Sequence, residues 1–110
     1  MDLGHLAMQT QKATIIVEGT FKEGYENYFE EYSKRVREFI SKNNGVTIRR
    51  QLITKTLYGQ RKPNLIILID FPSIEIAGTI FFDAEYISII PLRDKIFAYF
   101  NMYLADFGGV

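Results

Sequence analysis

The feature that most constrains this chain is a run of five apolar residues, Leu65 to Ile69, inside the segment Asn64 to Phe71. The run is far shorter than the ~20 residues that a membrane-spanning helix needs. Neighbouring side chains of a strand point to opposite sides, so a short strand that is apolar throughout is buried on both faces. The segment Ala13 to Glu18, closed by Gly19, has the same character. The sequence therefore predicts a sheet with two strands that need cover on both faces.

An amphipathic helix is predicted between these two segments. Apolar residues recur at steps of three and four from Phe21 to Ile40, while charged and amide side chains fill the other side. Thr20 and Glu23 have the spacing of a capping box, which predicts the start of the helix. Asn43-Asn44-Gly45 tolerates the left-handed backbone of a helix end, so we expect the helix to stop there.

A half-buried strand is predicted from Val46 to Tyr58, because apolar and polar residues alternate there. The alternation places Val46, Ile48, Arg50 and Leu52 on one face. Arg50 is therefore a charge on an apolar face. A polar turn at 59–63 then leads into the apolar strand 64–71.

The last third of the chain predicts short helices and a final strand. Ser73 is a typical cap for a second helix, and Asp83 restarts a helical turn that runs through Tyr86. Pro91 suits the first turn of a further helical segment, 92 to about 100, and 102–107 is predicted as the last strand. The inward stripe of the second helix is expected to be Ile74, Ala77, Gly78 and Phe81.

The resulting order, βαββαβ, predicts an α+β ferredoxin-like fold: a four-stranded antiparallel sheet with its helices on one face. The other face would expose more apolar surface than the roughly 300–600 Å² that soluble monomers tolerate. We therefore expect a homodimer packed sheet to sheet. The chain of 110 residues has room for one domain, predicted at 12–110 behind a flexible leader, 1–11.

Composition excludes several classes of function. Thirteen basic residues balance thirteen acidic ones, which argues against nucleic acid as a partner. No segment predicts a membrane span or a secretory signal, and the absence of cysteine suits a reducing cytoplasm. His5 is the only histidine and lies in the predicted leader, so we expect no catalytic triad, no histidine-based metal site and no proximal haem ligand. No cofactor is expected.

Three segments carry a resemblance to a known family: Phe71-Pro72-Ser73-Ile74-Glu75-Ile76-Ala77, Asp83-Ala84-Glu85-Tyr86 and Ile90-Pro91-Leu92-Arg93. They are similar to motifs of the bacterial domain-of-unknown-function 1330 family, within the dimeric α+β barrel superfamily. The resemblance covers about Ala13 to Phe107. It implies a ferredoxin-like protomer and a barrel-like dimer, and little about activity.

Further positions extend this resemblance. Arg50 falls at the strand arginine of the family, Tyr32 at its helix tyrosine and Gly59 at a glycine turn. Asp70 stands where the family has a glutamate, Gln51 where it has a glycine, and Tyr58 where it has an acidic residue. If these positions line a pocket, its chemistry here differs from that of the family.

Arg50, Tyr86 and Arg93 are the candidate ligand-binding residues, with Tyr32 beside them by resemblance. Two guanidinium groups and a phenol can clamp a carboxylate or another anion. The alternative is structural: Arg50 forms a buried pair with Asp70, and Tyr86 donates to a backbone carbonyl. Arg93 with Asp94 would then be charge at a helix start.

Asp70 is a candidate for a general base, since burial raises the pKa of a carboxyl group. The aromatic residues of the first helix suggest either core or an edge of a cavity that favours flat apolar ligands. Those residues are Tyr25, Tyr28, Phe29 and Tyr32.

Three functions remain open from the sequence. The first is a small-molecule-binding homodimer, whose ligand is anionic or aromatic. The second is a cofactor-independent enzyme of the monooxygenase or isomerase type known in the superfamily, with Asp70 as base and an arginine stabilising an enolate. The third is a purely structural dimer, which predicts a filled core instead of a cavity.

Overall fold

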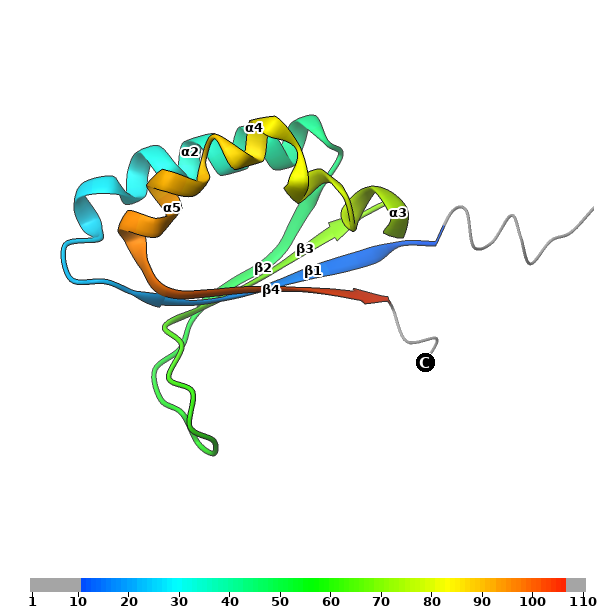
Figure 1. Ribbon diagram of the computed structural model, residues 1–110. Coiled ribbons are helices and arrows are strands. Elements are labelled where there is room, and N and C mark those ends of the chain that lie inside the picture. The colour runs from blue at the N-terminus through cyan, green and yellow to red at the C-terminus, as the bar shows by residue number, and fades with distance from the viewer. Residues whose placement is uncertain (1–10, 107–110) are drawn as a thin grey trace, which may run out of the picture.

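The computed structural model describes residues 11–106. Its four strands form one antiparallel sheet in the order β2-β3-β1-β4, and the helices cover one face of it (Figure 1). The α+β ferredoxin-like prediction is thus confirmed. The predicted leader with His5, and Phe107 of the last strand, lie outside the described residues apart from Gln11. The elements are β1 (Ala13–Phe21), α2 (Glu26–Lys42), β2 (Val46–Leu52), β3 (Leu65–Phe71), α3 (Ile74–Ala77), the 3-10 turn η1 (Ile80–Phe82), α4 (Ala84–Ile87), α5 (Ile90–Ile96) and β4 (Phe97–Asp106).

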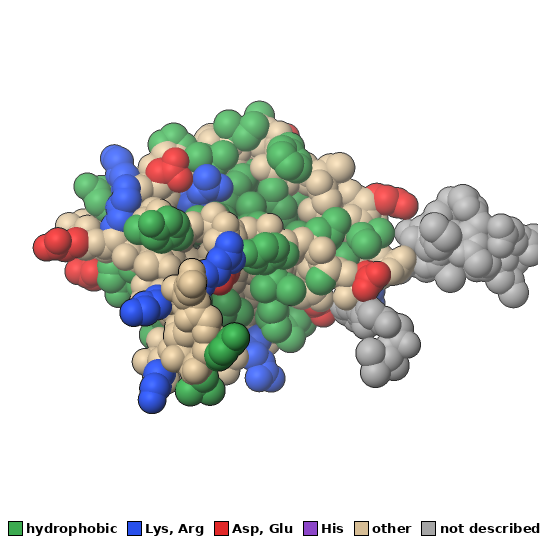
Figure 2. Space-filling view, turned by 60° about the horizontal axis from the view of Figure 1, so that its bottom comes forward, with side chains coloured by type: hydrophobic (Ala, Val, Ile, Leu, Met, Phe, Trp, Pro, Cys, Tyr) green, Lys and Arg blue, Asp and Glu red, His purple; other side chains and the backbone are tan. Residues whose placement is uncertain are grey.

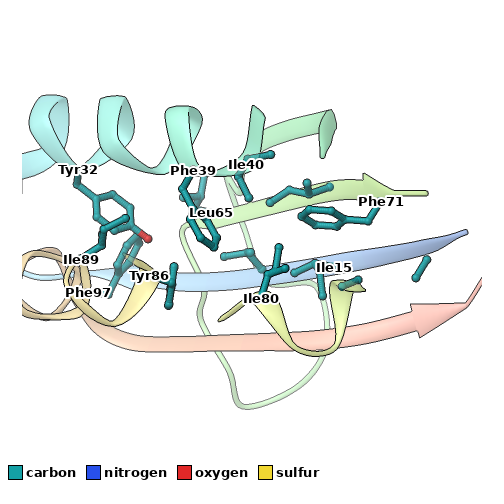
Figure 3. Close-up of a cluster of buried hydrophobic side chains, with 14 of the residues drawn as sticks. Ile15, Tyr32, Phe39, Ile40, Leu65, Phe71, Ile80, Tyr86, Ile89 and Phe97 are labelled. Carbon is teal, nitrogen blue, oxygen red and sulfur yellow. The ribbon is translucent and has the colours of Figure 1, made fainter. Parts of the chain in front are cut away.

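The hydrophobic core lies between the helices and the covered face of the sheet. Ala13, Ile15 and Val17 alternate along β1 and point into it, and all three are buried. Tyr32 and Phe39 reach down from α2 to meet them (Figure 3). The largest fully buried side chains are Phe39, Phe71, Leu65 and Ile96.

Gly19 does not close the first strand, so this prediction was wrong. β1 continues to Phe21, because β4 pairs with it along its whole length. The glycine serves a close approach instead: a Cβ atom there would lie 2.6 Å from Cε1 of Phe97, whose ring covers the position. The strand therefore passes under a core aromatic ring.

The predicted start of the long helix was also wrong, whereas its end is confirmed. Thr20 lies in β1 and donates from Oγ1 to the Lys62 carbonyl at 3.3 Å, and α2 begins at Glu26 without a side-chain cap. At the other end Asn44 has a φ of 63°, the left-handed conformation expected there. Asn43 Nδ2 also donates to the Phe39 carbonyl at 2.9 Å.

β2 is shorter than predicted and contains an irregularity that changes its faces. It ends at Leu52, and residues 53–64 form a long loop that projects beyond the open face (Figure 1). Val46 pairs with Asp70 and Arg50 with Ile67, with a register shift between Thr47 and Arg49. One extra residue in a strand reverses the alternation after it. Val46 and Arg50 therefore face opposite sides of the sheet, contrary to the predicted parity.

The C-terminal helices follow their predicted caps but are shorter. Ser73 accepts from the Ile76 amide at 3.3 Å, and Asp83 accepts from the Ala84 amide at 2.8 Å. α3 ends at Ala77, so the stripe predicted to run on to Phe81 is divided between α3 and η1. The helix expected over 92–100 stops at Ile96. Phe97 begins β4 because its backbone pairs with the end of β1.

The open face of the sheet combines an apolar middle with polar ends. Alternation and register place Ile16, Ile66 and Leu68 there, all of them partly exposed. Figure 2 brings this side forward and shows hydrophobic side chains gathered between charged ones. No helix within residues 11–106 has the length and apolarity to cross a membrane.

Candidate functional site

A cavity of about 240 Å³ lies between α2 and the covered face of the sheet. Aliphatic and aromatic side chains make up most of its wall. Of the polar ones, the tyrosines are buried, whereas Arg37, Thr47 and Arg50 are exposed. The cavity thus has a buried inner end and a mouth beside β2. Its polar lining consists of Tyr32, Ser33, Arg37, Thr47, Arg50 and Tyr86.

Two phenols meet at the inner end. Tyr32 comes from α2 and Tyr86 from α4, and their exposed fractions are 7% and 2%. Arg93 donates from Nη1 to the Tyr86 oxygen at 3.3 Å. The Tyr32 hydroxyl is near enough to Tyr86 for each phenol to affect the pKa of the other. The three side chains form a short polar chain within apolar surroundings.

Arg93, Tyr86 and Tyr32 together have more hydrogen-bond donors than acceptors for them. Arginine donates and cannot accept, so Tyr86 must be the acceptor toward Arg93. Even a hydrogen bond between the two phenols would use only one of their two protons, whichever of them donated. Within residues 11–106 no other group accepts from either hydroxyl. At least one phenolic O–H is therefore left to donate to something in the cavity.

Both phenols are neutral at physiological pH. Burial raises the pKa of Tyr32 far above its usual range, and the nearby Tyr86 reinforces the effect. Burial also raises the pKa of Tyr86, although Arg93 works in the opposite direction. Burial alone would lower the pKa of Arg93, but its bond to Tyr86 and the charge of Asp94 outweigh this and raise it. The inner end therefore offers a neutral donor rather than a phenolate.

The mouth carries two guanidinium groups. Arg50 reaches it because the irregularity in β2 turns this residue to the helix side. Its Cζ lies 5.2 Å from the ring centre of Phe29, within cation–π range. Arg37 stands one turn of α2 beyond Ser33, and both line the cavity. Within residues 11–106, no ion pair joins either arginine to a carboxylate.

The structure brings some of the predicted site residues together and separates others. Tyr32 and Tyr86 share the inner end, and Arg50 stands at the mouth. Arg93 supports Tyr86 from behind, with its guanidinium 4.8 Å from the ring centre of Phe100 and an ion pair to Asp94 at 3.4 Å. It does not itself line the cavity.

Asp70 lies on the open face, away from the cavity. Thr14 donates to it from Oγ1 at 2.7 Å. The buried pair expected between Asp70 and Arg50 does not form, because the reversed parity of β2 puts Arg50 on the other face. Among the aromatic residues of the first helix, Phe29 and Tyr32 line the cavity. Tyr25 stacks on Phe21 at 4.1 Å, away from it.

Sequence reasoning missed three polar residues of the lining: Ser33, Arg37 and Thr47. Phe29, Ser33 and Arg37 are spaced by four along α2, which places them on one helix face. That spacing could have indicated a common lining face, but the many aromatic residues of the helix drew the prediction to themselves. Within the described range, no cluster of three or more His, Cys, Asp or Glu side chains converges to hold a metal ion.

The fold defined by this sheet, its one-sided helices and its cavity is that of the ferredoxin-like α+β proteins. The family described as a domain of unknown function, DUF1330, matches residues 12–106, so the chain belongs to that family. This confirms the resemblance noted in the sequence. No curated protein matches the chain.

Several solved structures share the fold at low sequence identity. The RPA0582 protein of unknown function from Rhodopseudomonas palustris has a TM-score of 0.72 and 8% identity, over 94% of this chain and 92% of that one. A dimeric protein of unknown function from Bacteroides fragilis has a TM-score of 0.60 and 9% identity, over 87% and 96%. SnoaB from Streptomyces nogalater, described as a cofactor-independent oxygenase, has a TM-score of 0.57 and 14% identity, over 91% and 94%.

Proposed function

We propose that this protein is a homodimer in which each protomer binds a small molecule between α2 and the sheet. The observation that carries the proposal is that the phenols of Tyr32 and Tyr86, at the inner end of an apolar cavity, keep a proton for which the described residues provide no acceptor. Within residues 11–106 every fully buried side-chain N or O atom has a hydrogen-bond partner, so this proton is available for binding and is not a source of instability. A ligand with a carbonyl, hydroxyl or similar oxygen can accept it. The cavity supplies the apolar surface for the rest of the molecule.

The homodimer is supported by the open face. Ile16, Ile66 and Leu68 form an apolar centre on a surface that the helices leave uncovered. One structural neighbour is described as dimeric. We propose a second copy as the occupant of this face, because two chains of zero net charge do not repel each other strongly. The absence of cysteine supports a reducing cytoplasm as its location.

A cofactor-independent enzyme is the second candidate, and one neighbour is described as such an oxygenase. That hypothesis takes Asp70 as the base. Asp70 lies on the opposite face of the sheet, and the cavity lining contains no carboxylate or imidazole among the described residues. The binding function is therefore better supported. A purely structural dimer would need no cavity and no free donor in it.

The proposal is tested with 2-acetonaphthone, a flat neutral ketone, titrated by NMR into the full chain. We expect saturable binding to the wild type. The Tyr32→Phe/Tyr86→Phe variant should bind about tenfold more weakly, the equivalent of one hydrogen bond. Each single variant should lose less, because one phenol then still has a free proton. Tyr28→Phe is the control, since Tyr28 lies on the same helix outside the cavity.

A variant that fills the cavity shows where the ketone binds. Val36 lines the cavity from α2, and Val36→Trp should abolish the saturable binding. If the wild type does not bind the ketone, or if Val36→Trp binds it as well as the wild type, the proposal fails. Equal affinity of the double phenylalanine variant and the wild type would show that the phenols are not the donors.

A further inference from the structure

We infer that the ligand is an amphipathic organic anion, bound with its acidic group at the mouth beside Arg37 and Arg50 and its apolar body inside. This rests on the proposed function of the same cavity and adds the ligand's class and direction. The inference depends on how charge is distributed along the cavity. Its two ends differ in kind: a cationic mouth and a neutral, donating inner end.

The charge of the mouth has one sign. Arg37 and Arg50 both line it, and no acidic residue does so among the described residues. Neither arginine is neutralised by an ion pair within residues 11–106. The other polar lining of this end, Ser33 and Thr47, consists of hydroxyls that can donate to an anion. The chain as a whole has no net charge, so this positive mouth is a local feature.

The arginines are also held where an acid group would need them. The Arg50 guanidinium lies over the Phe29 ring, which restricts it to the rim of the cavity. Thr47 shares the same face of β2 only because the irregularity lies between the two residues. A planar guanidinium offers two parallel N–H groups that match a carboxylate. A carboxylate at the mouth would also remain partly hydrated, which avoids the cost of burying its charge.

The inner end of the cavity favours a neutral oxygen over an acid group. A carboxylate beside Tyr32 and Tyr86 would be fully desolvated in an apolar wall, with the Arg93 charge already engaged by Asp94 and Tyr86. A neutral oxygen there needs only the free phenolic proton. The volume, about 240 Å³, is just below the usual range of small-molecule sites, roughly 300–1,000 Å³. A small aromatic acid, with a neutral oxygen at the end remote from its acid group, fits both ends.

Two probes of similar shape separate the two ends. 2-Naphthoate has only the acid group, and 2-acetonaphthone has only the neutral ketone. We expect Arg37→Gln/Arg50→Gln to weaken naphthoate binding about tenfold or more, as loss of charge-assisted bonds requires, and to leave ketone binding within about twofold. Tyr32→Phe/Tyr86→Phe should weaken ketone binding about tenfold and leave naphthoate binding within about twofold. Raising the salt concentration should weaken binding of the naphthoate alone.

The matched control is Arg35→Gln/Arg49→Gln, which removes the same charge from the same two elements. Arg35 donates to Ser88 and Arg49 pairs with Leu68 on the open face, so neither lines the cavity. This control should leave the affinity for both probes unchanged. If it weakens naphthoate as much as the Arg37 and Arg50 pair does, the effect is one of overall charge and the inference is overturned.

The outcomes distinguish this inference from the proposed function. Ketone binding that depends on the phenols, together with naphthoate binding that ignores Arg37 and Arg50, overturns the inference and leaves the proposed function standing. Naphthoate affinity that follows the phenols instead of the arginines overturns the orientation. If neither probe binds, both the inference and the proposed function fail.

Discussion

Gly45 determines how closely the end of α2 meets β3. A Cβ atom at this position would lie 2.7 Å from both Ile40 Cγ2 and Phe71 Cε1, two buried side chains that have little room to move. Gly45→Ala should therefore destabilise the fold by about 1–3 kcal/mol, the usual cost of overpacking a core. Urea unfolding followed by circular dichroism measures the loss.

Gly78→Ala is the comparison for that experiment. Gly78 has helical φ and ψ, and an added Cβ would lie 3.3 Å from the end of the Leu104 side chain. Alanine at such a position costs little and restricts the unfolded chain. The two glycine variants should thus differ by more than about 1 kcal/mol. Equal stabilities would show that the contact at Gly45 relaxes without cost.

The buried phenols give stability a pH dependence in the alkaline range. The pKa of Tyr32 and that of Tyr86 are both raised by burial, so the folded state keeps protons that the unfolded state releases above pH ~10. The stabilisation is complete below that pH and is lost as the pH rises toward the folded-state pKa. The free energy of unfolding of the wild type should fall more steeply above pH ~10 than that of Tyr32→Phe/Tyr86→Phe. Parallel curves would contradict this.

Some residues of the candidate site could be predicted from the sequence, and others could not. Tyr86 and Arg50 could be proposed from the sequence, because a motif and a strand parity pointed to them. The role of Asp70 could not be predicted correctly, since its distance from Arg50 depends on one irregular residue in β2. No periodicity in a sequence reveals where a strand gains a residue.

At the scale of elements, α2 is stabilised at its end rather than at its start. Its last residues are held by the Asn43 side chain and by the left-handed Asn44. Asn44→Val should cost about 1–2 kcal/mol, because a β-branched side chain resists a positive φ, whereas Asn44→Gly should be neutral or slightly stabilising. Thermal unfolding compares the two variants.

The start of α2 supplies the control. Glu23 belonged to the predicted capping box, yet Thr20 is paired in β1 and no side chain caps the helix. Glu23→Ala should change the free energy of unfolding by less than about 0.5 kcal/mol. A loss near 1 kcal/mol, the typical value of a lost cap, would mean that the capping box operates after all.

The same contrast explains which elements could be predicted. The long helix, the apolar strand β3 and the caps at Ser73 and Asp83 depend on neighbouring residues, and their signals lie in the local sequence. The helix predicted over 92–100 gave way to β4, because Phe97, Tyr99 and Phe100 pair with the end of β1, and aromatic residues suit a strand. Element ends set by a distant partner strand are not visible in a single sequence.

At the scale of the whole molecule, the two faces of the sheet differ in character. The covered face holds the cavity with its phenols and arginines, whereas the open face shows an apolar centre around Ile16 and Leu68, which pair directly. Polar groups border this centre: Glu18 accepts from Arg61 at 2.6 Å and from Asn101 at 3.1 Å. An apolar centre with a hydrogen-bonded rim is the arrangement typical of a protein interface.

This arrangement predicts a dimer that a single substitution on the open face disrupts. Leu68→Arg would bury an unpaired charge between two sheets, at a cost that a modest interface cannot offset. In sedimentation at micromolar concentration we expect the wild type as a dimer and Leu68→Arg as a folded monomer. Ile87→Arg is the control, since Ile87 is 51% exposed on α4, on the helix side.

The unfolding transition of each variant must be measured alongside, because a monomer that is also unfolded would say nothing about the interface. Leu68 is partly exposed in the single chain, so arginine at this position should leave the isolated fold intact. Its thermal midpoint should still be lower than that of the wild type, because dimerisation stabilises the folded state, and this gap should grow with protein concentration. A wild type that sediments as a monomer, or a folded Leu68→Arg that remains a dimer, would show that a second copy does not cover this face.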